Sequence, residues 1–159
     1  MGTKGTFVGG LAVAVGLLGG GCGGTSAPDV ECNEATPIDI AGTFTERYNC
    51  AENDLCVDED VSFEIEIHSP LENEDGSMSY SMQDTLQLGW TGEGTLCGYV
   101  YTWTASTDVY VESGTWVFSD ADNFEKASSY DYVGGHGSCT GYGTRTGTPP
   151  APPPIGNCP

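Results

Sequence analysis

The stretch VSFEIEIH at residues 61–68 decides the fold of this chain. Its apolar side chains come at every second position and alternate with polar ones. The apolar residues are Val61, Phe63, Ile65 and Ile67. Because successive side chains of a β-strand point to opposite faces, this spacing puts all four on one face. The stretch therefore predicts a β-strand with one buried and one solvated face.

The same alternation recurs further along the chain. It returns in residues 78–82, 86–90, 97–103, 109–111 and 116–118. Turn-forming residues separate these segments, at 74–76, 92–94, 112–114 and 120–123. Short strands with a turn signal roughly every 8–12 residues are typical of antiparallel β-proteins.

We therefore expect an all-β fold over residues 38–146, an antiparallel up-and-down meander of eight or nine strands. Closing the meander into a small barrel would remove the exposed strand edges that favour aggregation. A β-sandwich is the alternative arrangement.

The amino terminus has the pattern of an export signal. Lys4 precedes an apolar run at residues 7–18, which small residues follow up to Cys22. A positively charged end, a short apolar stretch and small residues at the end predict a signal peptide over residues 1–21. The apolar run is shorter than the roughly 20 residues that a membrane-spanning helix needs.

Residues 18–22 (LGGGC) resemble the lipobox of bacterial lipoproteins. The resemblance implies that Cys22 carries a lipid and becomes the mature amino terminus. Gly19 stands where that family usually has Leu, so an ordinary secretory signal cut nearby is the alternative. Gly23, where Asp would retain a lipoprotein at the inner membrane, implies the outer membrane or cell surface of a bacterium.

The two ends of the mature chain differ from its middle. Residues 22–37 are small and polar and would form the anchor and a flexible tether. Residues 147–159 are rich in proline, which favours an extended conformation. We expect this tail to be a strap held back by Cys158, with a docking ligand for another protein as the alternative.

Charge excludes one class of function. The chain has 4 Lys and Arg against 23 Asp and Glu, and its formal net charge is −19. Such a surface repels phosphate backbones, so nucleic-acid binding is not expected.

Seven cysteines are present, and six remain when Cys22 is set aside: Cys32, Cys50, Cys56, Cys97, Cys139 and Cys158. An even number in an exported chain predicts three disulfides. Sequence alone does not choose among the pairings. Our working expectation joins Cys50 to Cys56, Cys97 to Cys139 and Cys32 to Cys158.

The predicted barrel resembles the lipocalin type. That family has a Gly-x-Trp on its first strand and an Arg near the end of its last, with the cation over the ring. Here Gly42-Thr43-Phe44 lies on the first predicted strand and Arg145 on the last. The resemblance implies that Arg145 lies over Phe44, which replaces the Trp.

No set of residues predicts catalysis. His136 lies in a glycine-rich loop, and residues 137–141 (GSCTG) have the form of a nucleophile elbow around Cys139. That motif needs a strand-turn-helix context, whereas strand follows here and parity assigns Cys139 to a disulfide. We therefore do not expect an enzyme.

Acidic clusters raise the question of calcium. They lie at residues 58–60, 72–75 and 120–123. None has EF-hand spacing, since Glu125 stands where that loop requires Gly. No cofactor is expected, and calcium is the one ion for which these clusters offer ligands.

Tyr99, Tyr101 and Trp103 share one face of a predicted strand. They could line a ligand cavity, form a platform for carbohydrate, or pack in the core. We expect a non-catalytic, lipid-anchored barrel that binds a small apolar or amphipathic ligand or presents its loops at the surface. The alternative is a structural or interaction protein whose acidic loops contact a cation or a basic partner.

Overall fold

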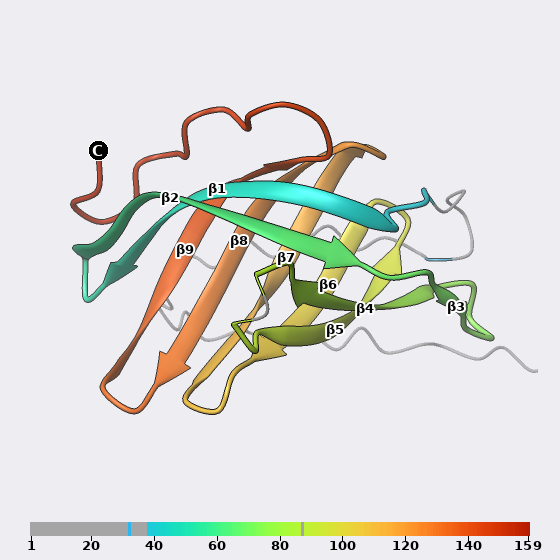
Figure 1. The fold of residues 1–159 in the computed structure, drawn as a ribbon, viewed down its shortest axis with the longest axis horizontal. Helices are drawn as coiled ribbons and strands as arrows, with labels where there is room; N and C mark the ends of the chain where they lie inside the picture. The colour runs from blue at the N-terminus through green and yellow to red at the C-terminus, as the bar shows by residue number, and fades with distance from the viewer. Residues whose placement is uncertain (1–31, 33–37, 87) are drawn as a thin grey trace, which may run out of the picture.

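The computed structural model describes residues 32, 38–86 and 88–159, and in this part of the chain every regular element is a β-strand (Figure 1). The strands are β1 (Gly42–Glu52), β2 (Leu55–Ile67), β3 (Leu71–Glu72), β4 (Met78–Asp84), β5 (Thr91–Cys97), β6 (Val100–Ser106), β7 (Tyr110–Asp120), β8 (Asn123–Tyr132) and β9 (Gly135–Thr144). None of the described residues forms a helix long and apolar enough to cross a membrane.

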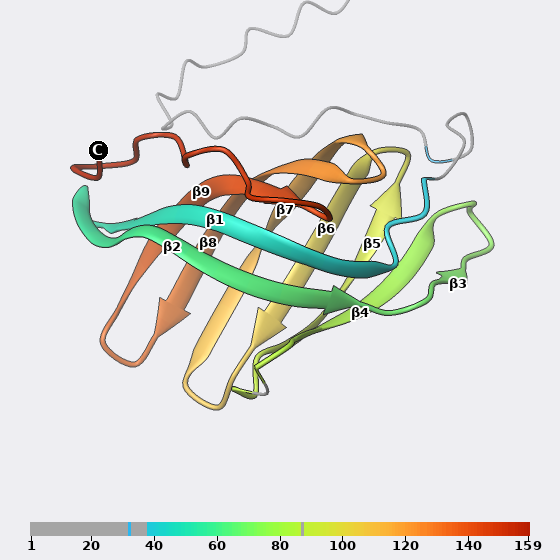
Figure 2. The same ribbon diagram turned by 45° about the horizontal axis from the view of Figure 1, so that its top comes forward.

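The strands form one antiparallel sheet that closes on itself. Their order is β2-β1-β9-β8-β7-β6-β5-β4-β3, and a further pairing of β2 with β4 completes the ring. This closing ladder is short, running from the pair Ile65–Asp84 to the pair Ile67–Met82. β3 pairs only with β4 and lies outside the ring. The predicted closed up-and-down barrel is confirmed (Figures 1 and 2).

Residues 61–68 behave as their alternation predicts. Ile65 and Ile67 are buried inside the barrel, and Phe63 packs against the same core. The core is largely aromatic. Its largest buried members include Phe44, Tyr101, Trp103, Trp116, Phe118 and Phe124.

The expected strand at residues 86–90 and two of the expected turns are wrong. Residues 85–90 form the connection between β4 and β5, where Leu86 and Leu88 are exposed. Residues 92–94 lie inside β5 and residues 112–114 inside β7. Glycine serves close packing at these places, because a Cβ on Gly94 would lie 2.6 Å from the ring of Tyr101.

Arg145 covers one end of the barrel. Its guanidinium carbon lies 4.7 Å from the centre of the Phe44 ring, so the contact that the resemblance implies is present. The guanidinium also donates hydrogen bonds to the carbonyls of Ala41 and Ala121. Gly42 makes room for it, because a Cβ there would lie 2.7 Å from Arg145 Nη1. We call this the closed end.

Three disulfides are present, as predicted, but the expected pairing is wrong. The bonds are Cys32–Cys97, Cys50–Cys139 and Cys56–Cys158. Cys50 and Cys139 are directly opposite each other on β1 and β9. The two cysteines become neighbours only because the last strand pairs with the first. The order of residues along the chain does not reveal this pairing.

The proline-rich segment 147–159 lies along the outside of β1 (Figures 1 and 2). Cys158 ties it to Cys56. The buried Asn49 side chain donates hydrogen bonds of 3.1 Å to the carbonyls of Pro153 and Pro159. The predicted signal at residues 1–21, lipid at Cys22 and tether at 22–37 lie outside the described residues, apart from Cys32.

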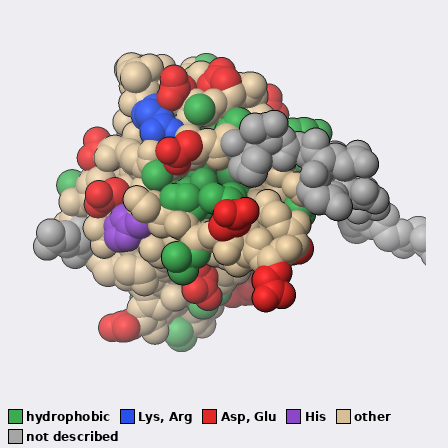
Figure 3. Space-filling view, turned by 90° about the vertical axis from the view of Figure 1, so that its right-hand side faces the viewer, with side chains coloured by type: hydrophobic (Ala, Val, Ile, Leu, Met, Phe, Trp, Pro, Cys, Tyr) green, Lys and Arg blue, Asp and Glu red, His purple; other side chains and the backbone are tan. Residues whose placement is uncertain are grey.

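Acidic side chains are spread over the surface. Figure 3 shows one end of the molecule, where they surround a hydrophobic area and basic side chains are few. This distribution is what the net charge of −19 predicts.

Candidate functional site

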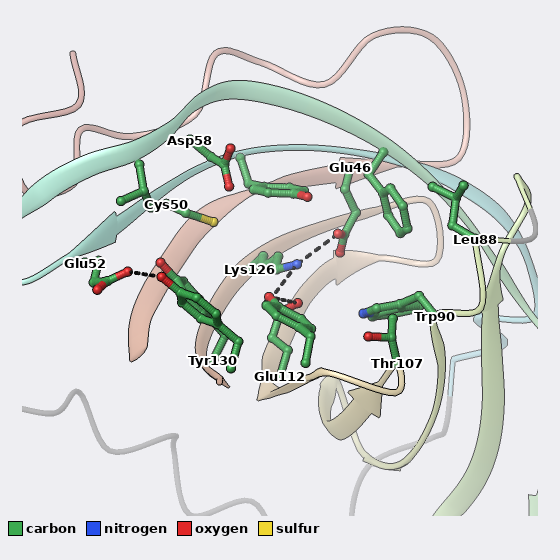
Figure 4. A pocket seen from close by; sticks show the side chains of 15 residues that line it. Glu46, Cys50, Glu52, Asp58, Leu88, Trp90, Thr107, Glu112, Lys126 and Tyr130 are labelled. Atoms are coloured by element: carbon green, nitrogen blue, oxygen red, sulfur yellow. Dashed lines mark hydrogen bonds and ion pairs between the residues drawn. The ribbon is translucent and has the colours of Figure 1, made fainter. Parts of the chain in front are cut away.

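A cavity of about 440 Å³ occupies the end of the barrel opposite Arg145 (Figure 4). Four hairpins meet there, β1–β2, β4–β5, β6–β7 and β8–β9, and each contributes lining residues. We call this the open end. The lining consists of Glu46, Tyr48, Cys50, Glu52, Val57, Asp58, Phe63, Leu88, Trp90, Thr107, Tyr110, Glu112, Lys126, Tyr130 and Tyr132.

A charged cluster forms the inner wall of this cavity. Lys126 Nζ on β8 lies 3.0 Å from Glu46 Oε2 on β1 and 3.1 Å from Glu112 Oε1 on β7. All three side chains are at least nine-tenths buried. Each occupies an inward position of its strand, so closure of the barrel brings them together. Such a group is stable only while its charges compensate one another, because each ion has been removed from water.

Lys126 carries a positive charge at neutral pH. Burial by itself lowers the pKa of Lys126, but the carboxylates of Glu46 and Glu112 outweigh burial and raise that pKa above its ordinary value. Burial raises the pKa of Glu46, and the attraction of Lys126 opposes the rise. Lys126 is therefore an ammonium ion and not a free amine.

The two carboxylates differ in how completely they are hydrogen-bonded. Glu112 accepts hydrogen bonds from Tyr110 Oη at 3.0 Å and from Ser128 Oγ, in addition to its ion pair. Glu46 Oε2 accepts from Lys126. Glu46 Oε1 is buried and has no hydrogen-bond partner among the described residues. A buried carboxylate oxygen without a donor is costly and points to a missing partner.

Aromatic rings cover the rest of the wall. Lys126 Nζ lies 4.5 Å from the centre of the Tyr48 ring, and the Tyr110 and Tyr130 rings stack at 5.6 Å. Trp90 meets Phe63 edge to face at 5.7 Å. The cavity therefore combines apolar surface with a small number of placed polar groups, as ligand sites usually do.

Further carboxylates lie nearer the mouth. Glu52 accepts a hydrogen bond of 2.9 Å from Tyr132 Oη, and Asp58 also lines the cavity. Together with Glu46 and Glu112, four acidic side chains face the cavity, and Lys126 is the one basic residue that lines it. The lining carries an excess of negative charge.

The predicted ligand-lining residues do not line this cavity. Tyr101 is fully buried in the packed core, where its hydroxyl donates to the Tyr80 carbonyl at 3.2 Å. Trp103 is also buried, and Lys126 Nζ lies 5.2 Å from its ring centre, below the cavity. Tyr99 lies in the connection between β5 and β6 and is exposed.

The candidate catalytic and metal-binding residues are separated from the cluster. Cys139 is bonded to Cys50 and has no free thiol. His136 is the second residue of β9 and is exposed. Over the described part of the chain, no group of three or more His, Cys, Asp or Glu side chains is arranged to hold a metal ion.

Sequence reasoning missed Lys126, Glu46 and Glu112. One signal was available for Lys126, which comes at an even spacing between Phe124 and Tyr130. A strand there would turn all three to one face. A lysine on an otherwise apolar face needs a buried carboxylate beside it. Which carboxylate this is depends on which strands are neighbours.

Ionisation of the cavity groups predicts how stability depends on pH. Burial raises the pKa of Tyr48 to about 12, from an ordinary value of 10.0. The folded state therefore holds this proton more tightly than the unfolded state does, as it does for Lys126. The free energy of unfolding should fall as pH rises above about 10, by up to about 1.4 kcal/mol per pH unit for each group.

Urea unfolding at about pH 8, 10 and 11 measures this slope. The variant Tyr48→Phe cannot ionise and should show a shallower decline above pH 10. An equal decline of unfolding free energy with pH in the two proteins would contradict the claim that the folded state holds the Tyr48 hydroxyl proton more tightly than the unfolded state does.

No protein-family model matches the chain. No curated protein matches it in sequence at a significant level. Among solved structures, a redesigned beta barrel is similar, with a TM-score of 0.41, 12% sequence identity and coverage of 77% of this chain and 100% of that chain. Function therefore has to be argued from the site itself.

Proposed function

We propose that this protein is a non-catalytic binding protein that holds a small cationic amphipathic ligand, an amine on an apolar or aromatic body, in the open end of its barrel. The observation that carries the proposal is the carboxylate of Glu46: the residue lines the cavity, and its buried Oε1 has no hydrogen-bond partner among the described residues. A ligand ammonium group would supply that donor.

Charge favours a cation over an anion. Lys126 is already paired with Glu46 and Glu112, so it offers little to an anionic ligand. Two more carboxylates, Glu52 and Asp58, face the same space. An approaching anion would be repelled by all four acidic groups, whereas a cation would be attracted.

The aromatic lining suits the same ligand. Tyrosine and tryptophan faces attract a desolvated cation by about 0.5–2 kcal/mol and also pack against an apolar body. Tyr48, Tyr110, Tyr130 and Trp90 provide such faces around the charged cluster. Binding rather than turnover is supported because Lys126 is held in two ion pairs and Cys139 is oxidised.

Titration calorimetry with ligands that share a phenyl group and differ in charge tests the proposal. The ligands are 2-phenylethylamine, 2-phenylethanol and 3-phenylpropionate. We expect the amine to bind at least about tenfold more tightly than the alcohol, a difference of about 1.4 kcal/mol, and the carboxylate to bind most weakly. Equal binding of amine and carboxylate, or no binding of the amine, would overturn the proposal.

We further propose that the domain is attached through a lipid on Cys22, in the cell envelope of a bacterium. The three disulfides use the six cysteines other than Cys22, and disulfides form in oxidising compartments outside the cytoplasm. The mass of the mature protein, extracted from membranes with detergent, should correspond to an acylated chain that begins at Cys22. An unmodified terminus at any other residue would end this proposal.

A further inference from the structure

Each of the four hairpins around the cavity mouth carries an exposed aliphatic side chain. Leu55, Leu88, Val109 and Val133 belong to the β1–β2, β4–β5, β6–β7 and β8–β9 connections or their edges, and are 62%, 68%, 65% and 93% exposed. Hairpin tips normally consist of small and polar residues. All four lie at the same end of the barrel, and apolar side chains gathered on one face are typical of an interaction surface. We call these four residues the rim.

The rim residues stand among acidic side chains. Asp54 precedes Leu55, Asp108 precedes Val109, and Asp131 is two residues before Val133; all three are exposed. Lys and Arg do not occur in the described residues of these hairpins, 52–58, 84–91 excluding 87, 106–110 and 131–136. The surface is therefore apolar and negatively charged together.

Local geometry fixes at least one of these tips. Asn53 and Asp54 have φ angles of 49° and 63°, which is the left-handed backbone of a two-residue hairpin turn. Leu55 directly follows this turn and pairs with Glu52. The rim is thus presented on a paired strand end and needs little ordering when a partner binds.

We propose that the rim docks a protein partner whose contact surface presents aliphatic side chains among Lys and Arg. The basic residues of such a partner would complement Asp54, Asp108 and Asp131 while its aliphatic side chains cover the rim. A second copy of this chain would bring like charges together, and an anionic lipid surface would be repelled.

The position of the disulfide Cys32–Cys97 favours a protein partner for the rim rather than the membrane that carries the anchor. Cys97 is the last residue of β5 and lies at the closed end. Cys32 comes ten positions after Cys22, a distance along the chain that spans at most about 36 Å. If Cys22 carries the proposed lipid, the closed end is held near the membrane and the rim points away from it. This orientation argument rests on the proposed attachment, whereas the rim itself does not.

The test uses the full mature chain and two synthetic peptides of equal length and charge. One repeats Lys-Leu-Lys-Leu and the other repeats Lys-Ser-Lys-Ser. We expect the leucine peptide to bind at least about tenfold more tightly than the serine peptide. Replacing Leu55, Val109 and Val133, the three rim residues that do not line the cavity, by Ser should abolish that difference. The control Leu71→Ser removes an equally exposed leucine on β3, outside the ring of the barrel, and should preserve it.

Several outcomes would overturn the proposal. These are equal binding of the two peptides, a leucine preference that survives in the rim variant, and a preference lost in Leu71→Ser. Rim-dependent binding to phosphatidylcholine or phosphatidylglycerol vesicles, or rim-dependent self-association, would also overturn it. Affinity for 2-phenylethylamine, measured on the same proteins, separates this result from a failure of the cavity proposal, because the rim variant changes none of the residues that line the cavity.

Discussion

Replacing Lys126 by Met should lower the free energy of unfolding by about 3–5 kcal/mol at neutral pH, which is the cost of breaking a buried ion pair from one side. The substitution removes the one cation that compensates Glu46 and Glu112 and leaves two carboxylates buried 3.0–3.1 Å from the vacated position. Urea unfolding monitored by tryptophan fluorescence measures the change.

Two variants make this prediction specific. Adding Glu46→Gln and Glu112→Gln to Lys126→Met removes the uncompensated charges and should recover much of the lost stability. Arg47→Met breaks the exposed Arg47–Asp60 pair and should have a much smaller effect. If Lys126→Met were no more destabilising than Arg47→Met, the cluster could not be a compensated buried group.

The double variant Cys50→Ala/Cys139→Ala should have the second large effect, a loss of about 4–5 kcal/mol in unfolding free energy. The disulfide joins residues that are 89 positions apart, so without it the unfolded chain gains the conformational entropy of a long loop. The variant Cys32→Ala/Cys97→Ala opens a loop of 65 positions and should lose slightly less.

Urea unfolding of the two double variants and the parent chain, all under non-reducing conditions, gives the comparison. A loss below about 1 kcal/mol for Cys50→Ala/Cys139→Ala would contradict the account, because the constraint on the unfolded chain depends on loop length alone in this argument. Retention of the barrel in the variant can be checked by the near-ultraviolet circular dichroism of the buried Trp103 and Trp116.

Alternation in the sequence was enough to predict the barrel. Residues 63–67, 78–82 and 116–118 carry their apolar side chains at every second position, and these side chains belong to the core, whereas those of 86–88 and 109–111 are exposed. The sequence could not reveal which strands become neighbours when the ring closes. Glu46, Glu112 and Lys126 come from three strands, and the pair Cys50–Cys139 exists because β9 returns to β1.

Two local interpretations hid the site. Residues 112–114 have the composition of a turn, so Glu112 was placed at a hairpin tip, whereas it is an inward residue of β7. Tyr101 and Trp103 do share an inward face, but they lie deeper than the cavity. Alternation gives the face of a strand and not the depth along the barrel, because depth depends on the stagger between strands.

Selection of a cationic ligand depends most on Glu46, and the affinity of 2-phenylethylamine for Glu46→Gln tests this most directly. Gln keeps the size of the side chain but removes the charge that would bind the ligand ammonium. We expect binding to weaken about ten- to a hundredfold, the value of a hydrogen bond to a charged group. The control Glu125→Gln makes the same change on the exposed outer face of β8 and should bind as the parent chain does. Equal weakening in both variants, or unchanged affinity in Glu46→Gln, would contradict the claim that the cavity selects a cation through this carboxylate.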